Sequence, residues 1–432
     1  MVRSDFKWFG PSLPHSTMLA VLKFFNVSDD WIDFFRRVLE APMKFADGPI
    51  QVRRRGTPIS GPLSVMLGET TLFILDFAFN QLTDGAHLYR LHDDIWFWGQ
   101  EETCIKGWEA MTEFTNLMGL EVNRDKTGSA LIPGKKDGKV MPVSYKLPRG
   151  EVHWGFLKLD CATGRFLIDQ ESLDKHIEEL RCQLASCKSV FDWIHAWNIY
   201  GTHFFTNHFG WPGNCYGIAH VDMLLDTFSQ IQKKLFASTG GSVTSTVKQM
   251  LTERFGVKNI PEGYLYFPMS RGGLDLKSPF INLYLMRDQL FEPDGYIEKF
   301  LKSEEEEYDA AKQKYENGGK VSRDRYMVHL DQKLMGAEFM SLAEFSRYRE
   351  SLSSKFQATY LNLIKEPDKE DLEPSHPSLE LSSDVLPYDN WVIQLYGQDI
   401  ISRFGSLNIV DKGLIPTGVV TMFRESRFKW DE

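Results

Sequence analysis

The chain has 432 residues, of which 42% are hydrophobic and 13% aromatic, and its formal net charge is -10. That composition excludes a disordered chain and suffices for two or three domains, each with its own core. The acidic balance, with a pI of about 5.7, argues against a generally basic nucleic-acid-binding protein but leaves room for a local basic groove.

The cysteines and the apolar runs indicate the cellular compartment in which we expect the protein. The five cysteines have no framework spacing, so we expect reduced thiols and an intracellular protein, in the nucleus or the cytoplasm. No secretory signal is found in the mixed segment after Met1. The longest apolar runs, such as residues 71–79, are short and interrupted by charge, so we expect a soluble protein with no membrane partner.

The first predicted elements hold two different groups of aspartates. Residues 5–19 read as a strand that turns into a helix, with Asp5 at its start. Asp29 and Asp30 follow Ser28 and mark a helix start, where Ser28 caps the helix and the carboxylates face the positive end of its dipole. An adjacent acidic pair is therefore a weak signal by itself.

A glycine-rich loop, residues 56–64, leads into a long helix that is apolar on most faces. Gly56, Pro58 and Gly61 would let the backbone of this loop approach a ligand closely. We expect the helix to be buried, which leaves its carboxylate Asp76 in need of a partner.

The segment from Ala86 to Gly99 carries the strongest candidate for chemistry. Apolar residues on both sides of His92, Asp93 and Asp94 predict two short strands with the aspartates at the bend. Adjacent carboxylates repel each other unless a cation lies between them, and hard divalent ions prefer oxygen ligands. With a third carboxylate, the pair would form a two-metal site able to move a phosphoryl group.

Three more elements follow this hairpin. Residues 102–118 predict an amphipathic helix that ends at Gly119. Residues 119–127 and 152–159 each predict a strand. Two basic runs are each either a local nucleic-acid contact or a solvated face. Arg53, Arg54 and Arg55 precede the glycine-rich loop, and the second run precedes the last strand: Lys135, Lys136, Lys139, Lys146 and Arg149.

Together, five segments resemble the palm of reverse transcriptases in kind and in order. They are an Asp followed by a helix, a Gly-x-Pro loop, an Asp-Asp hairpin, a strand that closes on Lys-Thr, and a Gly-Phe-Leu strand. The closest relatives in appearance are group II intron and LINE-like enzymes, or domesticated reverse-transcriptase-related genes of fungi. The resemblance implies an α+β fold: a right-hand polymerase palm (an antiparallel sheet with helices), a helical thumb and a mostly helical C-terminal extension.

The resemblance also implies a metal site. Asp5, Asp93 and Asp94 would hold two Mg²⁺ ions, with Mn²⁺ as an alternative, and the backbone carbonyl of Phe6 would be an additional ligand. Lys126 would protonate the leaving pyrophosphate or pair with it.

The remaining implied site residues would contact the nucleoside triphosphate and the primer. Trp154, Gly155 and Phe156 would position the primer end, or else pack palm against thumb. The nucleotide-binding set comprises Phe6, Phe9, Gly10, Arg55, Gly56, Pro58, Ile59, Ser60 and Gly61.

The chain departs from the family's pattern at several places. His92 stands where Ala or Val usually precedes the Asp pair. Ile59-Ser60 stands where a Gln-Gly pair usually follows the Gly-x-Pro sequence of the loop. Gly10 occupies the place of the aromatic residue that excludes a ribose 2′-hydroxyl in the family, so ribonucleotides would be admitted. The alternative is that Phe9 serves as this aromatic residue. The family's fingers, which normally precede the first aspartate, are missing, so a preceding segment or a partner would supply them.

Beyond the palm the pattern turns helical. Leu173, Ile177, Leu180 and Leu184 share one predicted helix face. The predicted domains begin with a palm at residues 1–165 and a thumb-like region at 166–240, which has further helices near 190–205 and 221–236. They continue with a helical extension at 241–365, an acidic proline-containing linker at 366–390 and a C-terminal helical segment at 391–432.

A cluster of potential zinc ligands also needs an interpretation. The spacing of His203, His208, Cys215 and His220 matches no zinc-binding pattern. We therefore expect packed or hydrogen-bonded histidines in this aromatic, helical region.

The expected function is a reverse-transcriptase-like nucleotidyltransferase, an RNA-directed DNA polymerase-like enzyme that extends a primer 3′-hydroxyl on an RNA or DNA template. The alternative is a catalytically inactive remnant that binds RNA or protein. The intact trio of aspartates favours the enzyme, whereas the acidic balance and the missing fingers favour the remnant.

Overall fold

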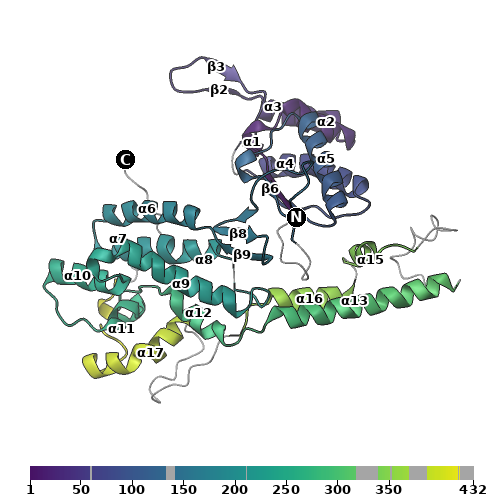
Figure 1. Ribbon diagram of the computed structural model, residues 1–432. Coiled ribbons are helices and arrows are strands. Elements are labelled where there is room, and N and C mark those ends of the chain that lie inside the picture. Colours follow the sequence, from purple (N-terminus) through teal and green to yellow (C-terminus); the bar gives the residue numbers. More distant parts are fainter. Residues whose placement is uncertain are drawn as a thin grey trace. The chain divides into compact units, whose positions relative to one another are not determined.

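The protein is an α+β protein whose chain divides into two compact units (Figure 1). The computed structural model describes residues 1–58, 61–132, 142–210, 212–317, 339–350, 353–368, 387–416 and 418. Unit 1 comprises Met1–Trp154, Lys158–Leu167 and Glu307–Leu352, and unit 2 comprises Gly155–Leu157, Ile168–Glu306 and Ser353–Glu432. The five predicted domains stay predictions.

A four-stranded sheet lies at the centre of unit 1, with the strand order β4-β5-β1-β6. Its central pair, β1 and β5, is antiparallel and places Val2 opposite Phe97 and Asp5 opposite Asp94. The side chains of Val2, Ile95 and Phe97 are buried, as expected for a sheet covered by helices. The strands are β1 (Val2–Asp5), β4 (Tyr89–Leu91), β5 (Asp94–Phe97) and β6 (Gly128–Ser129).

Helices pack around this sheet and share one hydrophobic core with it. Phe6, Leu75, Phe79 and Phe114 belong to this core, and all four side chains are nearly fully buried. The helices of unit 1 are α1 (Phe9–Ser12), α2 (His15–Phe24), α3 (Asp29–Leu39), α4 (Pro62–Leu82), α5 (Glu101–Met118) and α15 (Leu342–Arg349), with a 3₁₀ turn at Arg124–Lys126.

Helix α4 follows the glycine-rich loop, as predicted, but is not buried all round. Phe73 and Phe77 are 49% and 59% exposed, because only one face of the helix packs into the core. Among the described residues α4 is also long and apolar enough to cross a membrane by length and composition, contrary to our expectation. Core helices pass the same test, so this finding by itself does not place the chain in a membrane.

Two other helix ends follow the sequence closely. Helix α3 begins at Asp29, as predicted, although the Ser28 side chain makes no capping hydrogen bond. Helix α5 ends at Gly119, whose φ of 69° is the left-handed conformation that glycine adopts without strain.

Two predicted strands take different forms. Residues 119–127 form only an isolated bridge between Val122 and Phe6, followed by the 3₁₀ turn. Residues 152–159 form two strands, because Gly155, with a φ of 56°, reverses the chain between them. These are β7 (His153–Trp154) and β8 (Leu157–Asp160), which form a sheet with β9 (Arg165–Ile168). A further hairpin pairs β2 (Pro42–Lys44) with β3 (Ile50–Val52).

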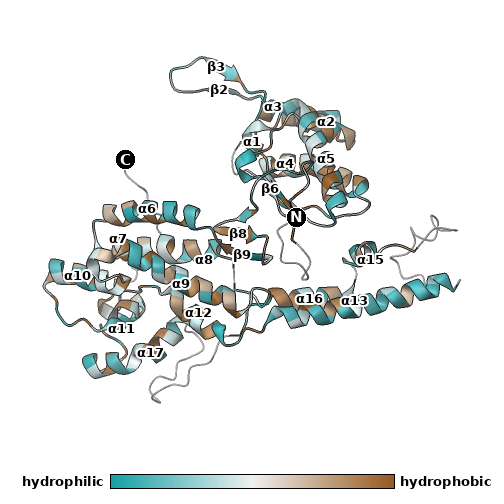
Figure 2. Ribbon diagram, viewed as in Figure 1, coloured by the Kyte–Doolittle hydropathy of each residue, from teal (hydrophilic) through white to brown (hydrophobic). Residues whose placement is uncertain are grey.

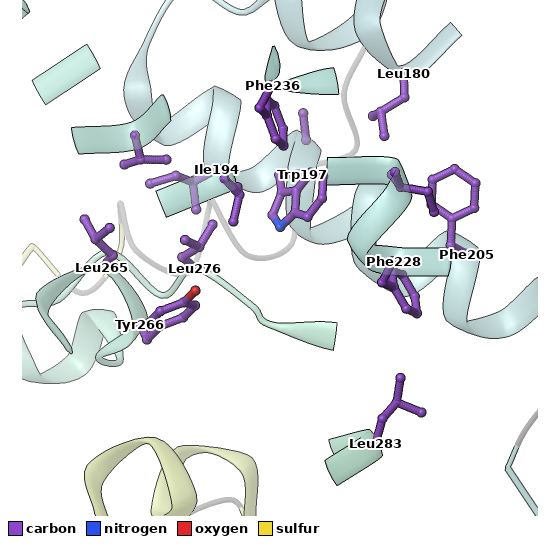
Figure 3. Packing of buried hydrophobic residues seen from close by; sticks show 14 of the residues in the cluster. Leu180, Ile194, Trp197, Phe205, Phe228, Phe236, Leu265, Tyr266, Leu276 and Leu283 are labelled. Carbon is purple, nitrogen blue, oxygen red and sulfur yellow. The ribbon is translucent and has the colours of Figure 1, made fainter. Parts of the chain in front are cut away.

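Unit 2 is helical in its described part and has a core of its own, part of which Figure 3 shows around Trp197 and Phe228. The helices of unit 2 are α6 (Gln170–Ser186), α7 (Val190–Ala196), a π-helical segment (Trp197–His203), α8 (Phe204–His208), α9 (Gly217–Leu235), α10 (Val243–Phe255), α11 (Glu262–Tyr266), α12 (Pro279–Arg287), α16 (Ser354–Ile364) and α17 (Pro387–Phe404), with 3₁₀ turns at Ala237–Thr239, Met269–Arg271 and Lys412–Leu414.

The predicted thumb-like helices are found in unit 2. The four leucine and isoleucine side chains predicted to share one face of α6 are all buried. The helix predicted over residues 190–205 is interrupted by the π-helical segment, where Gly201 lies directly against the buried ring of Trp197. A side chain at Gly201 would lie 2.3 Å from that ring, so the close approach requires glycine.

The last predicted helix is also present, as α17. Its side chains Val392, Ile393 and Ile400 are fully buried in the core of unit 2, so this helix packs against that unit. The predicted linker falls largely on residues 369–386, outside the described residues. One of the boundaries between the units, after Glu306, falls within α13 (Pro293–Glu316), a helix that is hydrophilic over most of its length (Figure 2).

The suspected zinc ligands of unit 2 make ordinary packing and hydrogen-bond contacts. His208 Nδ1 lies 2.7 Å from the Phe204 carbonyl oxygen, and His203 Nε2 lies 3.1 Å from Asn207 Nδ2. The buried ring of His220 stacks on Tyr216 with 4.4 Å between centroids. Burial lowers the pKa of His220 to about 4, so it is neutral in the folded protein at pH 7.

His220 should make the stability of the fold dependent on pH. Its pKa is depressed below the ordinary value of 6.5, so the unfolded chain binds the proton first. Its contribution is therefore fully present above pH 6.5 and is lost as the pH falls toward 4, by about 3 kcal/mol. Urea unfolding of the native chain and of His220→Gln at successive pH values should show a flatter profile for the variant. His176→Gln should keep the native profile, and identical profiles for all three would contradict the assignment.

Candidate active site

Asp5 and Asp94 face each other at the end of the central strand pair. Asp5 is the last residue of β1 and Asp94 the first of β5, and they are direct partners in the antiparallel register. Directly opposite residues of such a pair have Cβ atoms about 4.5–5.5 Å apart. Asp5 is only 5% exposed, so one of the two carboxylates is held in a poorly solvated place.

Asp93 enters this site from the hairpin between β4 and β5. Leu91 pairs with Asp94, so His92 and Asp93 form a two-residue loop, as the sequence predicts for the bend. His92 has a φ of 54°, which the first loop residue of a type II′ hairpin requires and which glycine usually supplies.

The electrostatics of Asp93 show that the three carboxylates act on one another. Burial raises the pKa of Asp93, and the charges of Asp5 and Asp94 raise it further, while Lys126 opposes them. A carboxylate whose pKa is raised by two like charges is more readily ionised when a cation binds beside it.

Two side-chain cations already neutralise part of this site. Lys126 Nζ lies 2.6 Å from Asp5 Oδ2, and this bond is the main cause that raises the pKa of Lys126. Arg3 Nη2 lies 3.4 Å from Asp94 Oδ1. Lys126 is positioned by the 3₁₀ turn that follows Asn123, whose backbone N–H donates to the Asp5 carbonyl at 2.8 Å.

The donor set is of the kind that a hard divalent cation takes, because it consists of carboxylate oxygens that repel one another. In the described part of the chain, however, no three His, Cys, Asp or Glu side chains lie close enough together to hold an ion. A divalent ion at Asp5 and Asp94 would have to displace Lys126 and Arg3 from them.

The predicted sugar gate and the residues around it lie at the start of α1. The Phe9 ring is buried and stacks on Phe6 at 5.6 Å, so it belongs to the core of unit 1. Gly10 is open: a Cβ added there would meet only Thr57 Oγ1, at 3.7 Å. The backbone of Phe6 lies opposite Val122 in the isolated bridge.

The glycine-rich loop is pinned beside Gly10 by backbone hydrogen bonds. Gly56 N donates to Leu13 O at 2.9 Å and Thr57 N donates to Gly10 O at 3.2 Å. Gly56 has a φ of 86°, and a Cβ there would lie 3.0 Å from Pro11 O. Arg55 Nη1 donates to the carbonyls of Ser12 and Gly119 at 3.3 and 3.1 Å.

Of the other loop residues, Pro58 is exposed and Gly61 precedes α4 as its N-cap. Ile59 and Ser60 lie outside the described residues, as do Lys135, Lys136 and Lys139 of the predicted basic run.

The three predicted primer residues divide between the units. Trp154 belongs to unit 1, is 48% exposed and stacks on Trp96 at 4.4 Å. Gly155 and Phe156 belong to unit 2, where Phe156 is buried among aromatic rings that include Phe205. A Cβ on Gly155 would lie 2.8 Å from His208 O, so this turn requires glycine.

A network of four side chains that we did not predict holds the Asp93 loop. Arg90 forms two hydrogen bonds with Asp76, at 2.8 and 2.7 Å, and a third with Glu69 at 2.7 Å. Glu69 also contacts His92 Nδ1 at 2.7 Å. Arg90 is the partner that the sequence required for Asp76.

The sequence did contain a signal for this network. Glu69 and Asp76 are seven residues apart, two turns of one helix, so they share a face of α4. Arg90 lies in β4 and His92 is the first residue of the loop that follows, so both come from the hairpin that carries Asp93. Two acids facing a cation and a histidine are a complementary set.

The network has a clear electrostatic effect on its members. The hydrogen bonds that Arg90 donates to Asp76 raise the pKa of Arg90 above its ordinary value. Burial would raise the pKa of Glu69, but the hydrogen bonds from Arg90 and His92 outweigh it and lower that pKa. Glu69 therefore stays ionised and fixes His92 in its unusual backbone conformation, which stabilises the loop that carries Asp93.

Asp76→Asn should destabilise unit 1 by about 1–2 kcal/mol, because it removes a charge-assisted, two-point contact with a mostly buried guanidinium. Asp33→Asn, which breaks an exposed ion pair within α3, should change stability by no more than about 0.5 kcal/mol. Chemical unfolding of both variants tests this, and equal effects would mean that the Asp76–Arg90 contact contributes nothing particular.

Comparisons with known proteins add little to this geometry. No family model matches the chain, and neither does any curated protein sequence. Among solved structures the chain is similar to a telomerase of Candida tropicalis, in complex with the TWJ fragment of telomeric RNA, at 15% identity and a TM-score of 0.27. The match covers 55% of this chain and 39% of that telomerase chain, and a score of this size carries no argument about activity.

Proposed function

We propose that the chain is a reverse-transcriptase-like nucleotidyltransferase that adds nucleotides to a primer 3′-hydroxyl on an RNA or DNA template. One observation supports this most: Asp5 and Asp94 are direct partners at the ends of β1 and β5, and the charges of both act on Asp93 in the loop before Asp94, a repulsion that a bound cation would relieve. The telomerase likeness is too weak to add to it.

In the proposed reaction the primer 3′-hydroxyl loses its proton to water as its oxygen attacks the α-phosphorus, a new P–O bond forms, and the bond to the pyrophosphate oxygen breaks. Asp5, Asp93 and Asp94 would hold two Mg²⁺ ions, which stabilise the attacking and leaving oxygens when bound. Lys126 would protonate the leaving pyrophosphate or pair with it, and for this its ammonium group would have to leave Asp5.

The nucleotide itself would lie against the loop and α1. The fixed backbone of Gly56 and Thr57 would support the base and sugar, and the open space at Gly10 would accept a 2′-hydroxyl. The chain would then use ribonucleoside triphosphates as well as deoxyribonucleoside triphosphates.

A second candidate function has its own supporting observation. Lys126 and Arg3 already balance the charges of Asp5 and Asp94, so the cluster is electrostatically tolerable without an ion. A remnant that binds RNA or protein without turnover would keep such a cluster as part of its fold.

Primer extension with labelled nucleotides in Mg²⁺ and then Mn²⁺ tests the proposal. The native chain should extend a template-annealed primer, and Asp93→Asn with Asp94→Asn should lose at least about a hundredfold in rate, because several kcal/mol of charge stabilisation are removed. The matched control is Asp29→Asn with Asp30→Asn, the acidic pair at the start of α3, which should keep the native rate.

Extension that survives in the Asp93 and Asp94 variant would overturn the assignment of the site. A folded native chain that extends no primer in either metal, yet binds the template, would favour the remnant.

The choice of sugar tests Gly10. Native chain should incorporate ribonucleotides, and Gly10→Tyr should reduce that incorporation by about tenfold or more relative to deoxyribonucleotides, because the ring fills the space beside Thr57. Gly10→Ala, which adds one methyl group at ordinary contact distance, should leave the ratio of the two rates unchanged. A ratio equally insensitive to tyrosine would place the sugar elsewhere.

A further inference from the structure

Unit 2 contains a cavity of about 560 Å³, well away in sequence from the aspartates of the proposed active site. Its volume lies within the range of about 300–1,000 Å³ that small-molecule sites occupy. The wall is mainly apolar and comes from α7, α10, α11 and the end of α17; it includes Phe191, Leu251, Ile260, Tyr264, Phe404 and Ile409.

The cavity exists because two helices end beside it. Gly256 ends α10 with a φ of 67°, and Gly405 follows α17 with a φ of 77°. At both places the chain turns away in a left-handed conformation, so the helices stop and the connecting residues form a wall.

This wall is held by hydrogen bonds. Thr252 Oγ1 donates to Val257 O at 2.9 Å, and Ile409 N donates to Arg271 O at 2.8 Å. The segment that includes Ile409 is thereby attached to the turn after α11. The cavity is therefore largely formed before any ligand arrives.

The charged residues that line the cavity are all positive. Arg254 and Arg403 come from the last turns of α10 and α17, Lys258 comes from the segment between α10 and α11, and the lining contains no Asp or Glu. Arg254 donates to the Lys188 carbonyl at 2.6 Å, whereas Lys258 and Arg403 form no hydrogen bond or ion pair within the described part of the chain. Three cations around an apolar space contrast with the net charge of -10 for the whole chain.

We infer that this cavity binds a small organic anion with an apolar body, whose acidic group pairs with Lys258 and Arg403. The apolar wall accounts for the body of such a ligand through the hydrophobic effect. The two uncommitted cations account for its charge, since a charge-assisted bond at the mouth of an apolar cavity is stronger than one in water. The inference does not depend on the proposed polymerase activity.

Two fluorescent probes of nearly the same shape test the inference. The full chain should bind 8-anilinonaphthalene-1-sulfonate, which carries an acidic group, more tightly than N-phenyl-1-naphthylamine, which does not. Lys258→Gln with Arg403→Gln should weaken binding of the anionic probe by about tenfold, the loss expected for a charge-assisted contact, and leave the neutral probe unchanged.

A control pair and a filled cavity complete the experiment. Lys233→Gln with Lys302→Gln changes the net charge equally but lies outside the cavity lining, and it should bind both probes as the native chain does. Ile260→Trp should abolish binding of both probes while circular dichroism and the melting temperature report a native fold.

Competition with dodecanoate and dodecanol then uses probes without aromatic rings. Dodecanoate should displace the anionic probe from the native chain, and dodecanol at the same concentration should do so less well. Equal affinity for the charged and neutral probes, or unchanged binding in the filled cavity of a folded chain, would overturn the inference.

Discussion

The antiparallel pairing of β1 with β5 is the constraint on which the candidate site depends. It fixes Asp5 opposite Asp94, and Asp93 lies in the hairpin loop directly before β5. Burial, and after it the like charges of Asp5 and Asp94, raise the pKa of Asp93. The surrounding structure must therefore supply positive charge. Lys126, in the 3₁₀ turn, pairs with Asp5, and Arg3, in β1, pairs with Asp94.

The loop that presents Asp93 is held from outside the sheet. Arg90 and Glu69 connect it to α4, and Glu69 holds the His92 ring. His92 thus has a structural partner in this chain. The same contacts explain why α4 can carry Glu69 and Asp76 on a helix that is otherwise apolar.

Much of the fold could be predicted from local patterns. Gly119 ends α5 and the α6 face is buried as expected, because the helical period and a left-handed glycine are properties of the neighbouring residues alone. The strand expected after Gly119 failed for the opposite reason. A strand exists only where a partner offers hydrogen bonds, and there the chain just after β1 offers only the isolated bridge at Phe6.

The sequence by itself determined the hairpin around His92 and Asp93, the glycine-rich loop and the helical second half, since each depends on residues close together in the chain. Only the tertiary structure decided that Lys126 bonds to Asp5, that Phe9 is buried in the core, and that Arg90 is the partner of Asp76. Such pairings join residues distant in sequence. Their geometry follows from how helices and strands pack together, which no local pattern specifies.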